Sequence, residues 1–371
     1  MFVRTTSSPT LPPPLATRGP VAFIREQLFA GPISALFTLG AVMLLISFVP
    51  DIWRYLVTDA VFSSVDGQAC RRPEAGMCWS FIANKLEFFA YASYPRDALW
   101  RVNLCLASGA VLITWLLWPG AKRKGIGGAL FFLVYPVACF WLLHGFEALS
   151  LRTVPTNLWG GIFVSLLVSL VGIVFSLPGG VLLALGRRSK LPVVRFFSTL
   201  FIEFVRGVPL ITVLFMANTM LPLFVPENWS PDRLMRPLIG VALFASAYMA
   251  EVVRGGLQAI GKGQYEGAQA LGLSYWQMMR LIILPQALTV VIPGIVNTFI
   301  GLFKDTTLVA VVGIADFLRT VETARVDPAW AGPTISTSGY LFAALFYFVF
   351  CFGMSRYSLM MERRLSSARQ R

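Results

Sequence analysis

The sequence predicts an all-α polytopic membrane protein with about eight transmembrane helices. Its composition and its long apolar stretches predict this fold class. Hydrophobic residues make up 56% of the 371 residues, and charged residues make up only 13%. A soluble globular domain has about 25% charged residues, so too little polar surface remains here to cover a water-soluble particle. Several uncharged stretches reach about 18 residues, which is long enough to cross a bilayer as a helix.

Eight uncharged runs mark the expected spans. The first begins at Pro32, which is tolerated there because the first turn of a helix has unpaired N–H groups in any case. The fourth is expected to be broken by Pro178-Gly179-Gly180, and the short sixth to extend past Glu251 and Arg254 into the headgroup region. The runs are residues 32–49, 103–118, 126–143, 158–186, 207–226, 237–250, 281–303 and 333–355.

A further apolar piece, residues 306–315, is too short to span a bilayer. We expect it to be re-entrant or buried against other helices. Lys304 and Asp305 stand just before this piece, near the expected outer end of the seventh span. They could order the piece or contact a docking protein, and the sequence does not choose between these roles.

Clusters of Lys and Arg orient the chain. The net charge is +13, and the basic residues gather in short loops beside the apolar runs, as cytoplasmic loops do. If the spans alternate, every such cluster falls on the same side as the basic N-terminal tail. We therefore expect both termini in the cytoplasm, a multi-pass protein in the lipid bilayer, and no nucleic-acid partner. The clusters are Lys122, Arg123 and Lys124; Arg187, Arg188, Lys190 and Arg195; Arg254, Lys262 and Arg280; and Arg356, Arg363, Arg364, Arg369 and Arg371.

The regions outside the spans differ in character. Residues 1–30 are rich in Pro, Ser and Thr and carry arginines, which predicts a disordered cytoplasmic tail without a cleavable signal peptide. The loop at about 51–100 is expected outside, where an oxidising compartment permits a disulfide between Cys70 and Cys78. The other cysteines, Cys105, Cys139 and Cys351, lie in apolar runs and are expected to be core residues. With one histidine, His144, the sequence predicts no metal site.

The segment 261–285, between spans six and seven, predicts two short helices joined by a sharp bend. Residues 264–271 are good helix formers. Gly272 follows where a left-handed helix C-cap belongs. Ser274 with Gln277 three residues later forms a capping box that opens the second helix. We call this segment the elbow; its shape alone is equally consistent with a surface hairpin that has no partner.

The elbow resembles the "EAA" signature of ABC importer permeases, which reads E-A-A, three residues, G, nine residues, I, one residue, L-P. The matching residues here are Glu266, Gly267, Ala268, Gly272, Ile282, Leu284 and Pro285, with Gly267 in place of Ala. In that family the elbow docks on the ATP-binding cassette subunit and transmits its closure. The resemblance implies coupling roles for these residues. It also implies that ATP and Mg are bound by the partner and that this chain has no cofactor of its own.

Two further stretches resemble permeases for polar amino acids. Residues 201–209 look like their I-E-x-x-R-G-x-P stretch, with Glu203, Arg206 and Pro209 at its fixed positions, and residues 304–308 look like their K-D-T-S-L stretch, which adds Thr306. The resemblance covers residues 155–360, a five-span core within 151–361. Residues 31–150 form a three-span extension like that of long, M-type subunits of general L-amino-acid importers, and 362–371 form a basic cytoplasmic tail.

The resemblance implies an importer that carries polar or general L-amino acids across a bacterial inner membrane. Its partners would be the ATP-binding subunit, a second permease subunit and a periplasmic amino-acid-binding protein. The sequence itself leaves two roles open for the charged residues Glu203 and Arg206. Glu203 and Arg206, three apart on a helix, can pair, and a structural pair at the cytoplasmic gate is favoured over a substrate ligand.

Two other functions were weighed against this one. An ion-coupled secondary transporter would carry acidic or polar groups near the midplane of several spans, and spans one, four, five and seven have no carboxylate. An enzyme acting alone is suggested by residues 256–263, which imitate a phosphate-binding loop. Gly263 replaces the Ser or Thr that would hold Mg²⁺, and no strand precedes the glycines, so we expect no catalytic residues and no ATP hydrolysis in this chain.

Overall fold

A computed structural model describes residues 24–64, 67–118, 120–146, 151–226 and 231–369. The chain divides into two compact units, described separately. The first comprises Met1–Ser80 with Gly332–Thr334, and the second comprises Phe81–Ala331 with Ile335–Arg371. The expected tail, residues 1–30, lies outside the described residues up to residue 23, and Ile24–Leu28 within it forms a π-helical turn.

The first unit is built on one long apolar helix. α2 (Pro32–Trp53) continues through a π-helical stretch, Arg54–Thr58. None of this candidate span is buried inside the protein, so its side chains are available to lipid. The unit also holds a 3₁₀ turn, Gln68–Arg71, whose Cys70 forms a disulfide with Cys78 across a Cα separation of 5.8 Å. This is the pair that the sequence predicts, and the Thr334 hydroxyl donates to the Cys70 carbonyl at 3.3 Å.

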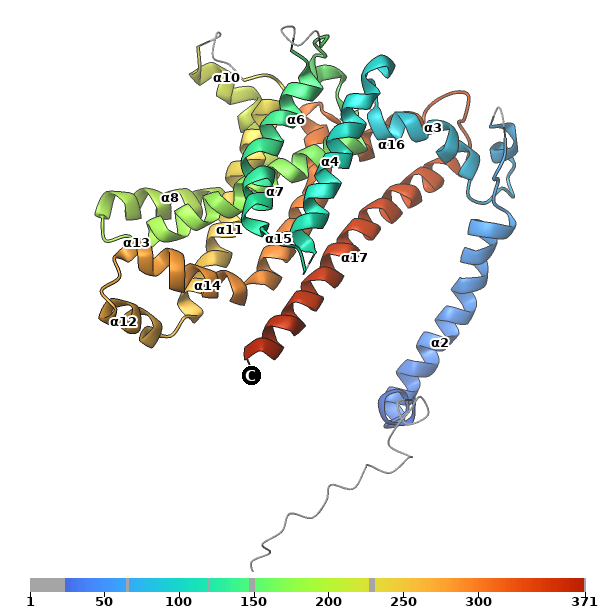
Figure 1. Cartoon of the computed structure of the whole chain (residues 1–371). Helices are drawn as coiled ribbons and strands as arrows, with labels where there is room; N and C mark the ends of the chain where they lie inside the picture. The colour runs from blue at the N-terminus through green and yellow to red at the C-terminus, as the bar shows by residue number, and fades with distance from the viewer. Residues whose placement is uncertain (1–23, 65–66, 119, 147–150, 227–230, 370–371) are drawn as a thin grey trace, which may run out of the picture. The chain divides into compact units, whose positions relative to one another are not determined.

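The second unit consists almost entirely of helices (Figure 1). Its long helices are α3 (Trp79–Tyr91), α4 (Leu99–Leu117), α6 (Tyr135–His144), α7 (Ile162–Arg187), α8 (Pro192–Gly207), α11 (Met235–Ala259), α15 (Ile292–Asp305) and α17 (Ile335–Arg369). Its shorter helices are α5 (Lys124–Ala129), α9 (Leu210–Phe215), α10 (Leu221–Phe224), α12 (Lys262–Ala270), α13 (Tyr275–Met278), α14 (Leu284–Val290) and α16 (Phe317–Ala324). 3₁₀ turns lie at Arg96–Ala98 and Thr156–Leu158, and π-helical stretches at Leu130–Val134 and Met216–Met220.

Among the described residues, seven helices are long and apolar enough to cross a membrane, or eight if one bent pair is counted as a span. The bent pair is Pro192–Gly207 with Leu210–Phe224, at 108° to one another. The expected fifth run therefore corresponds to its second arm, and its first arm, α8, falls between the fourth and fifth runs, where no span was expected. The bend follows from Gly207 and Pro209, since the residue before a proline is disfavoured in the α region.

Two expected spans need correction. The fourth is not broken by Pro178-Gly179-Gly180: α7 runs through Pro178 without interruption. The seventh was placed at 281–303, whereas the structure separates α14 from α15 at Val291 and continues α15 into a 3₁₀ stretch, Thr306–Val312. The candidate span is Ile292–Val312. Lys304 and Asp305 consequently lie inside it rather than at its outer end.

The glycines of α7 allow a close contact with α11. A Cβ on Gly179 would come within 2.4 Å of the Ser246 hydroxyl, and one on Gly180 within 2.6 Å of the Met249 side chain. Contacts further along join Arg187 to Glu251 and Arg188 to Leu257. The contacts advance in the same direction along both helices, so α7 and α11 run parallel and their C-terminal ends lie together.

The piece 306–315 is partly buried, with Thr306, Val309, Val312 and Ile314 in the interior and Val311 exposed, and it continues a span instead of turning back. It leads into β2 (Ala315–Asp316), which pairs in parallel with β1 (Gly160–Gly161). Gly161 has a φ of +78°, and a Cβ there would meet the backbone of Phe89 and Ala90. This two-residue ladder ties the start of α7 to the start of α16.

The segment 51–100, which was expected to be a loop, contains regular secondary structure. It contains α3, whose Phe81 and Phe89 are fully buried. Their rings contact Trp330, Phe317 and Phe342 of the same unit. The C-terminal stretch, expected as a tail from residue 362, is likewise helical through Arg369 in α17.

Candidate functional site

The bend of the elbow has the geometry that its sequence predicts. The Leu273 N–H donates to the Ala268 carbonyl at 3.2 Å, and the Gly272 N–H donates to the Gln269 carbonyl at 2.9 Å. This pair of bonds is a Schellman motif, which ends α12 and requires a residue with positive φ. Gly272 supplies it with a φ of +70°. The bend therefore depends on a residue without a Cβ.

The second arm of the elbow starts from a complete capping box. The Gln277 N–H donates to the Ser274 hydroxyl at 3.4 Å, and the Ser274 N–H donates to the Gln277 side chain at 2.9 Å. These bonds occupy N–H groups that the first turn of α13 would leave unpaired. A π-helical stretch, Met279–Ile283, continues this arm into α14, whose first turn contains Pro285.

The inner face of the elbow is anchored to the ends of the long helices. Ala268, Met278 and Ile283 are at most 5% exposed. They share one hydrophobic cluster with Ala184 and Leu185 of α7, Ile202 of α8, and Met249, Ala250, Val253 and Leu257 of α11. Ile282 and Leu284 pack against the same cluster. A Cβ on Gly256 would lie 2.6 Å from the Ala287 carbonyl, so α11 and α14 are in direct backbone contact.

Polar contacts fix α12 to the end of α7. Arg188 donates to the Tyr265 hydroxyl at 3.1 Å and to the Leu257 carbonyl at 3.2 Å. Its guanidinium carbon lies 5.6 Å from the centroid of the Tyr265 ring, within cation–π range. Across the elbow, Gln286 donates to the Gln264 side chain at 3.0 Å. Both arms are therefore held to the body of the unit and to one another.

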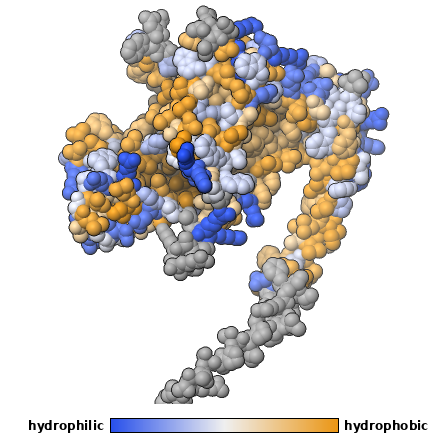
Figure 2. Space-filling model, in the orientation of Figure 1, coloured by the Kyte–Doolittle hydropathy of each residue, from blue (hydrophilic) through white to orange (hydrophobic). Residues whose placement is uncertain are grey.

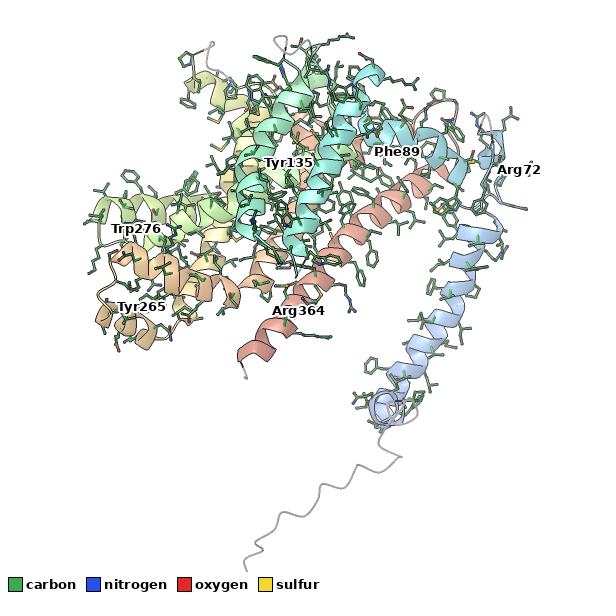
Figure 3. The ribbon with its side chains drawn as sticks, viewed as in Figure 1. Arg72, Phe89, Tyr135, Tyr265, Trp276 and Arg364 are labelled. Atoms are coloured by element: carbon green, nitrogen blue, oxygen red, sulfur yellow. A yellow bond between two sulfur atoms is a disulfide. The ribbon has the colours of Figure 1, made fainter. Side chains whose placement is uncertain are left out.

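The outer face of the elbow is exposed and partly apolar. Glu266 and Gly267 are exposed, and Leu271 and Trp276 expose 76% and 67% of their surface. Figure 3 shows Tyr265 and Trp276 on the two arms, and Figure 2 shows hydrophobic and hydrophilic side chains intermixed at this end of the unit. None of α12 or α13 belongs to a candidate span. Exposed large apolar side chains of this kind are typical of surfaces that bind a partner.

A cluster of five charged residues lies beside the anchoring cluster. Glu251 of α11 accepts from Arg187 of α7 at 2.7 Å and from Arg254 at 2.7 Å, and lies 3.5 Å from Arg206 of α8. Arg187 also binds Glu203 of α8 at 2.8 Å. We call these residues the charge cluster. Its centre, Glu251, exposes 15% of its side chain.

The expected pairing of Glu203 with Arg206 is wrong. Within the described chain each of them pairs across to another helix, Glu203 with Arg187 and Arg206 with Glu251. The physical reason is the half-buried carboxylate of Glu251, which attracts the nearby guanidinium groups more strongly than an exposed i,i+3 partner does. Pro209 lies just beyond this cluster, at the 108° bend that precedes α9.

The remaining sequence candidates lie in a different part of the unit. Thr306 is 1% exposed and donates to the Phe303 carbonyl at 2.8 Å. Phe303 stacks among aromatic residues of α17, including Phe346 and Phe350. Lys304 is exposed and Asp305 is half-buried. The structure does not bring these three residues into the cluster that anchors the elbow.

The most connected residues of the site were not singled out from the sequence. Arg187 and Arg188 were counted only as cytoplasmic charges, and Glu251 only as the point where a span meets the headgroups. A signal was present: Glu251 and Arg254 are three apart in a mostly apolar helix, and a carboxylate in such a place requires a partner. The contribution of α7 and α8 depends on tertiary packing.

Comparison with known proteins assigns the chain a family. Residues 176–367 match the model of the "Binding-protein-dependent transport system inner membrane component". The inner membrane amino-acid ABC transporter permease protein YhdY of Escherichia coli K12 is 48% identical over 94% of each chain. The glutamate/glutamine/aspartate/asparagine transport system permease protein BztC of Rhodobacter capsulatus is 38% identical over 98% of each chain. A solved amino acid ABC transporter is 28% identical, with a TM-score of 0.48, over 55% of this chain and 92% of that one.

Proposed function

Because this chain belongs to the family of binding-protein-dependent transport system inner membrane components, we propose that its elbow is the docking and coupling site for an ATP-binding subunit. The chain is the permease subunit of an ATP-driven amino-acid importer, a multi-pass protein of the inner membrane. The relatives are ABC transporter permeases, and nothing in them supports an ion-coupled transporter. The family works with ATP-binding subunits and a substrate-binding protein.

The two-faced construction of the elbow carries this proposal. Its inner face shares a buried cluster with the ends of α7, α8 and α11, and its outer face exposes Glu266, Leu271 and Trp276. A partner that binds the outer face can therefore displace the membrane helices through the inner one. Each of the seven residues that match the signature takes part as an exposed contact, as the bend or as an anchor. They are Glu266, Gly267, Ala268, Gly272, Ile282, Leu284 and Pro285.

This chain itself binds no nucleotide in our proposal and hydrolyses none. Gly256 and Gly255 are inside α11, which runs to Ala259, and Lys262 opens α12. The backbone N–H groups of residues inside a helix are committed to the helix and cannot cradle phosphates. The ATP and its Mg²⁺ then belong to the partner subunit.

The assembly that we propose contains a second permease subunit beside this one, with both termini of this chain in the cytoplasm. The basic clusters after the even-numbered spans support that orientation. For the substrate we propose polar L-amino acids, with glutamate, glutamine, aspartate and asparagine as the first set to test. BztC, which is similar to almost the whole chain, is a transport system permease for these four amino acids and supports this set.

The test substitutes Gly272 in the assembled importer reconstituted in vesicles. Gly272→Val places a Cβ at a φ of +70°, which strains the bend, so uptake and substrate-stimulated ATP hydrolysis should both fall at least tenfold. Gly353→Val is the control, because Gly353 lies in α17, outside the elbow, with open space around it and no positive φ, and it should leave both activities near wild type.

A second substitution tests the outer face. Trp276→Glu keeps the bend but replaces an exposed apolar ring with a charge, and it should reduce the amount of ATP-binding subunit that co-purifies with this chain. Normal uptake by Gly272→Val, with full co-purification of the partner by Trp276→Glu, would exclude the elbow as the coupling site.

A further inference from the structure

The charge cluster joins the helices that hold the elbow. Arg187 is the last residue of α7, Glu203 and Arg206 lie in the last turns of α8, and Glu251 and Arg254 lie in α11. Both oxygens of the Glu251 carboxylate are used: one accepts from Arg187, and the other accepts from Arg254 through two nitrogens. Removal of α7 would leave Glu203 without Arg187, and removal of α11 would leave Arg206 without Glu251.

The cluster is also continuous with the elbow. Arg187 and Arg188 are neighbours at the end of α7, yet they reach in different directions. Arg187 bridges Glu203 and Glu251, and Arg188 binds Tyr265 in the first arm of the elbow. On α11, Glu251 lies between Ala250 and Val253, which are buried in the cluster that includes Ala268 and Ile283 of the elbow. Ion pairs and apolar contacts thus attach the same helix ends to the elbow.

From this geometry we propose that Glu251 is a positioning residue for transport: it clamps the ends of α7 and α8 to α11, so that a displacement of the elbow moves all three helices together. The proposal rests on the proposed coupling function of the elbow. Glu251 contacts neither the substrate nor the partner in this scheme. Its carboxylate offsets the mutual repulsion of Arg187, Arg206 and Arg254, which would otherwise spread the helix ends apart.

The loss of this one charge should therefore uncouple the importer without dismantling it. In Glu251→Gln the shape of the side chain is kept, but three guanidinium groups lose their shared anion. We expect amino-acid uptake in vesicles to fall at least tenfold. We also expect the ratio of ATP hydrolysis with loaded binding protein to that without it to fall towards one. Glu251→Asp keeps the charge and should restore most of both.

A graded control comes from the cluster itself. Within the described residues Glu203 forms an ion pair within 4 Å with Arg187 alone, and it exposes 57% of its side chain. Glu203→Gln should therefore lower the stimulation ratio less than Glu251→Gln does. Glu322→Gln removes the exposed pair with Arg319 on α16 and should not change the ratio. If Glu251→Gln prevents assembly, the same order is read from Arg206→Gln, which removes one contact of Glu251, and from Glu203→Gln.

The outcomes separate this proposal from the one on which it rests. A stimulation ratio near wild type in Glu251→Gln, or the same ratio in Glu251→Gln and Glu322→Gln, overturns the clamp while leaving the elbow intact. A fall in membrane content or melting temperature with an unchanged ratio also overturns it, because that is the result of a purely structural role. If Gly272→Val transports normally, the coupling function of the elbow fails first.

Discussion

At the scale of single residues, two buried carboxylates are stabilised in different ways. Glu251 is surrounded by guanidinium groups from three positions. Asp316, between two candidate spans, is fully buried and accepts from the backbone N–H groups of Leu318 and Arg319, which caps α16. Backbone donors cap a helix well, but they do not supply a full opposite charge. Burial therefore raises the pKa of Asp316 to about 6.

This shift predicts a pH-dependent contribution to stability. The folded pKa of Asp316 lies above the ordinary value of 3.8, so the folded protein binds the proton more tightly than the unfolded chain does. The contribution is fully present below pH 4 and is lost as the pH rises through 6, which amounts to about 3 kcal/mol for a shift of about two pH units. In detergent, wild type should gain melting temperature relative to Asp316→Asn between pH 7 and pH 4.

The Asn variant is informative because its side-chain oxygen still caps the helix while its charge does not titrate. An unchanged difference in melting temperature between the two proteins across this pH range would contradict the assignment.

The capping residues and the bend of the elbow were predictable because each depends on chemistry within a few positions. Gly272, Ser274 and Gln277 form the motifs that their order in the sequence predicts. The charge cluster was not predictable in the same way. Its pairs between helices join residues 16, 45 or 64 positions apart, Arg187 with Glu203, Arg206 with Glu251 and Arg187 with Glu251. Only the packing of α7, α8 and α11 decides which guanidinium meets which carboxylate.

At the scale of elements, the apolar runs predicted most spans, whereas the helix-breaking residues Pro178, Gly179 and Gly180 led to a wrong prediction of a break. Pro178 lies inside a continuous α7, since neighbouring helices can satisfy the backbone groups that a proline frees in a membrane helix. Gly179 and Gly180 next to it serve close packing against α11 rather than a break. No span was expected at α8, because Arg195, Glu203 and Arg206 interrupt its apolar residues and leave no uncharged run of membrane length.

The role of Gly180 in packing can be tested by comparison with Gly353, which is also inside a long helix. Gly180→Ala would place a methyl group 2.6 Å from the Met249 side chain, and such overpacking costs about 1–3 kcal/mol. Gly353 lies in α17 with open space around it, so Gly353→Ala should be neutral or slightly stabilising. The melting temperatures of the purified subunits in detergent measure the contrast. Equal effects of the two substitutions would show that α7 and α11 are not in close contact there.

At the scale of the whole molecule, hydropathy and charge predicted the class, and the arrangement of the N-terminal extension required the structure. α3 shows no uncharged run of membrane length, yet its Phe81 and Phe89 are buried among aromatic residues that lie over 200 positions later in the chain, Phe317 and Trp330. No local pattern encodes such a contact. The disulfide of Cys70 and Cys78 could be predicted from the sequence because the two residues are only eight positions apart.

The orientation of the whole chain is open to direct measurement. Fusions of a reporter that works only in the periplasm should be active after residue 70 and inactive after residues 124, 190 and 371. The physical reason is the one-sided distribution of Lys and Arg, which are retained in the cytoplasm. Activity of the fusion after residue 190 would overturn the orientation of the core.

Because α7 and α11 run parallel, the chain between them has to cross the bilayer an odd number of times. Two consecutive spans whose C-terminal ends meet, as they do where Arg188 donates to the Leu257 carbonyl, cannot be joined by a chain that stays on one side of the bilayer. The segment between Arg187 and Met235 has to return across, and Leu210–Phe224, the second arm of the bent pair, is the helical stretch available for that crossing. With this crossing the candidate spans among the described residues number eight, which is the parity that the proposed cytoplasmic placement of both termini requires.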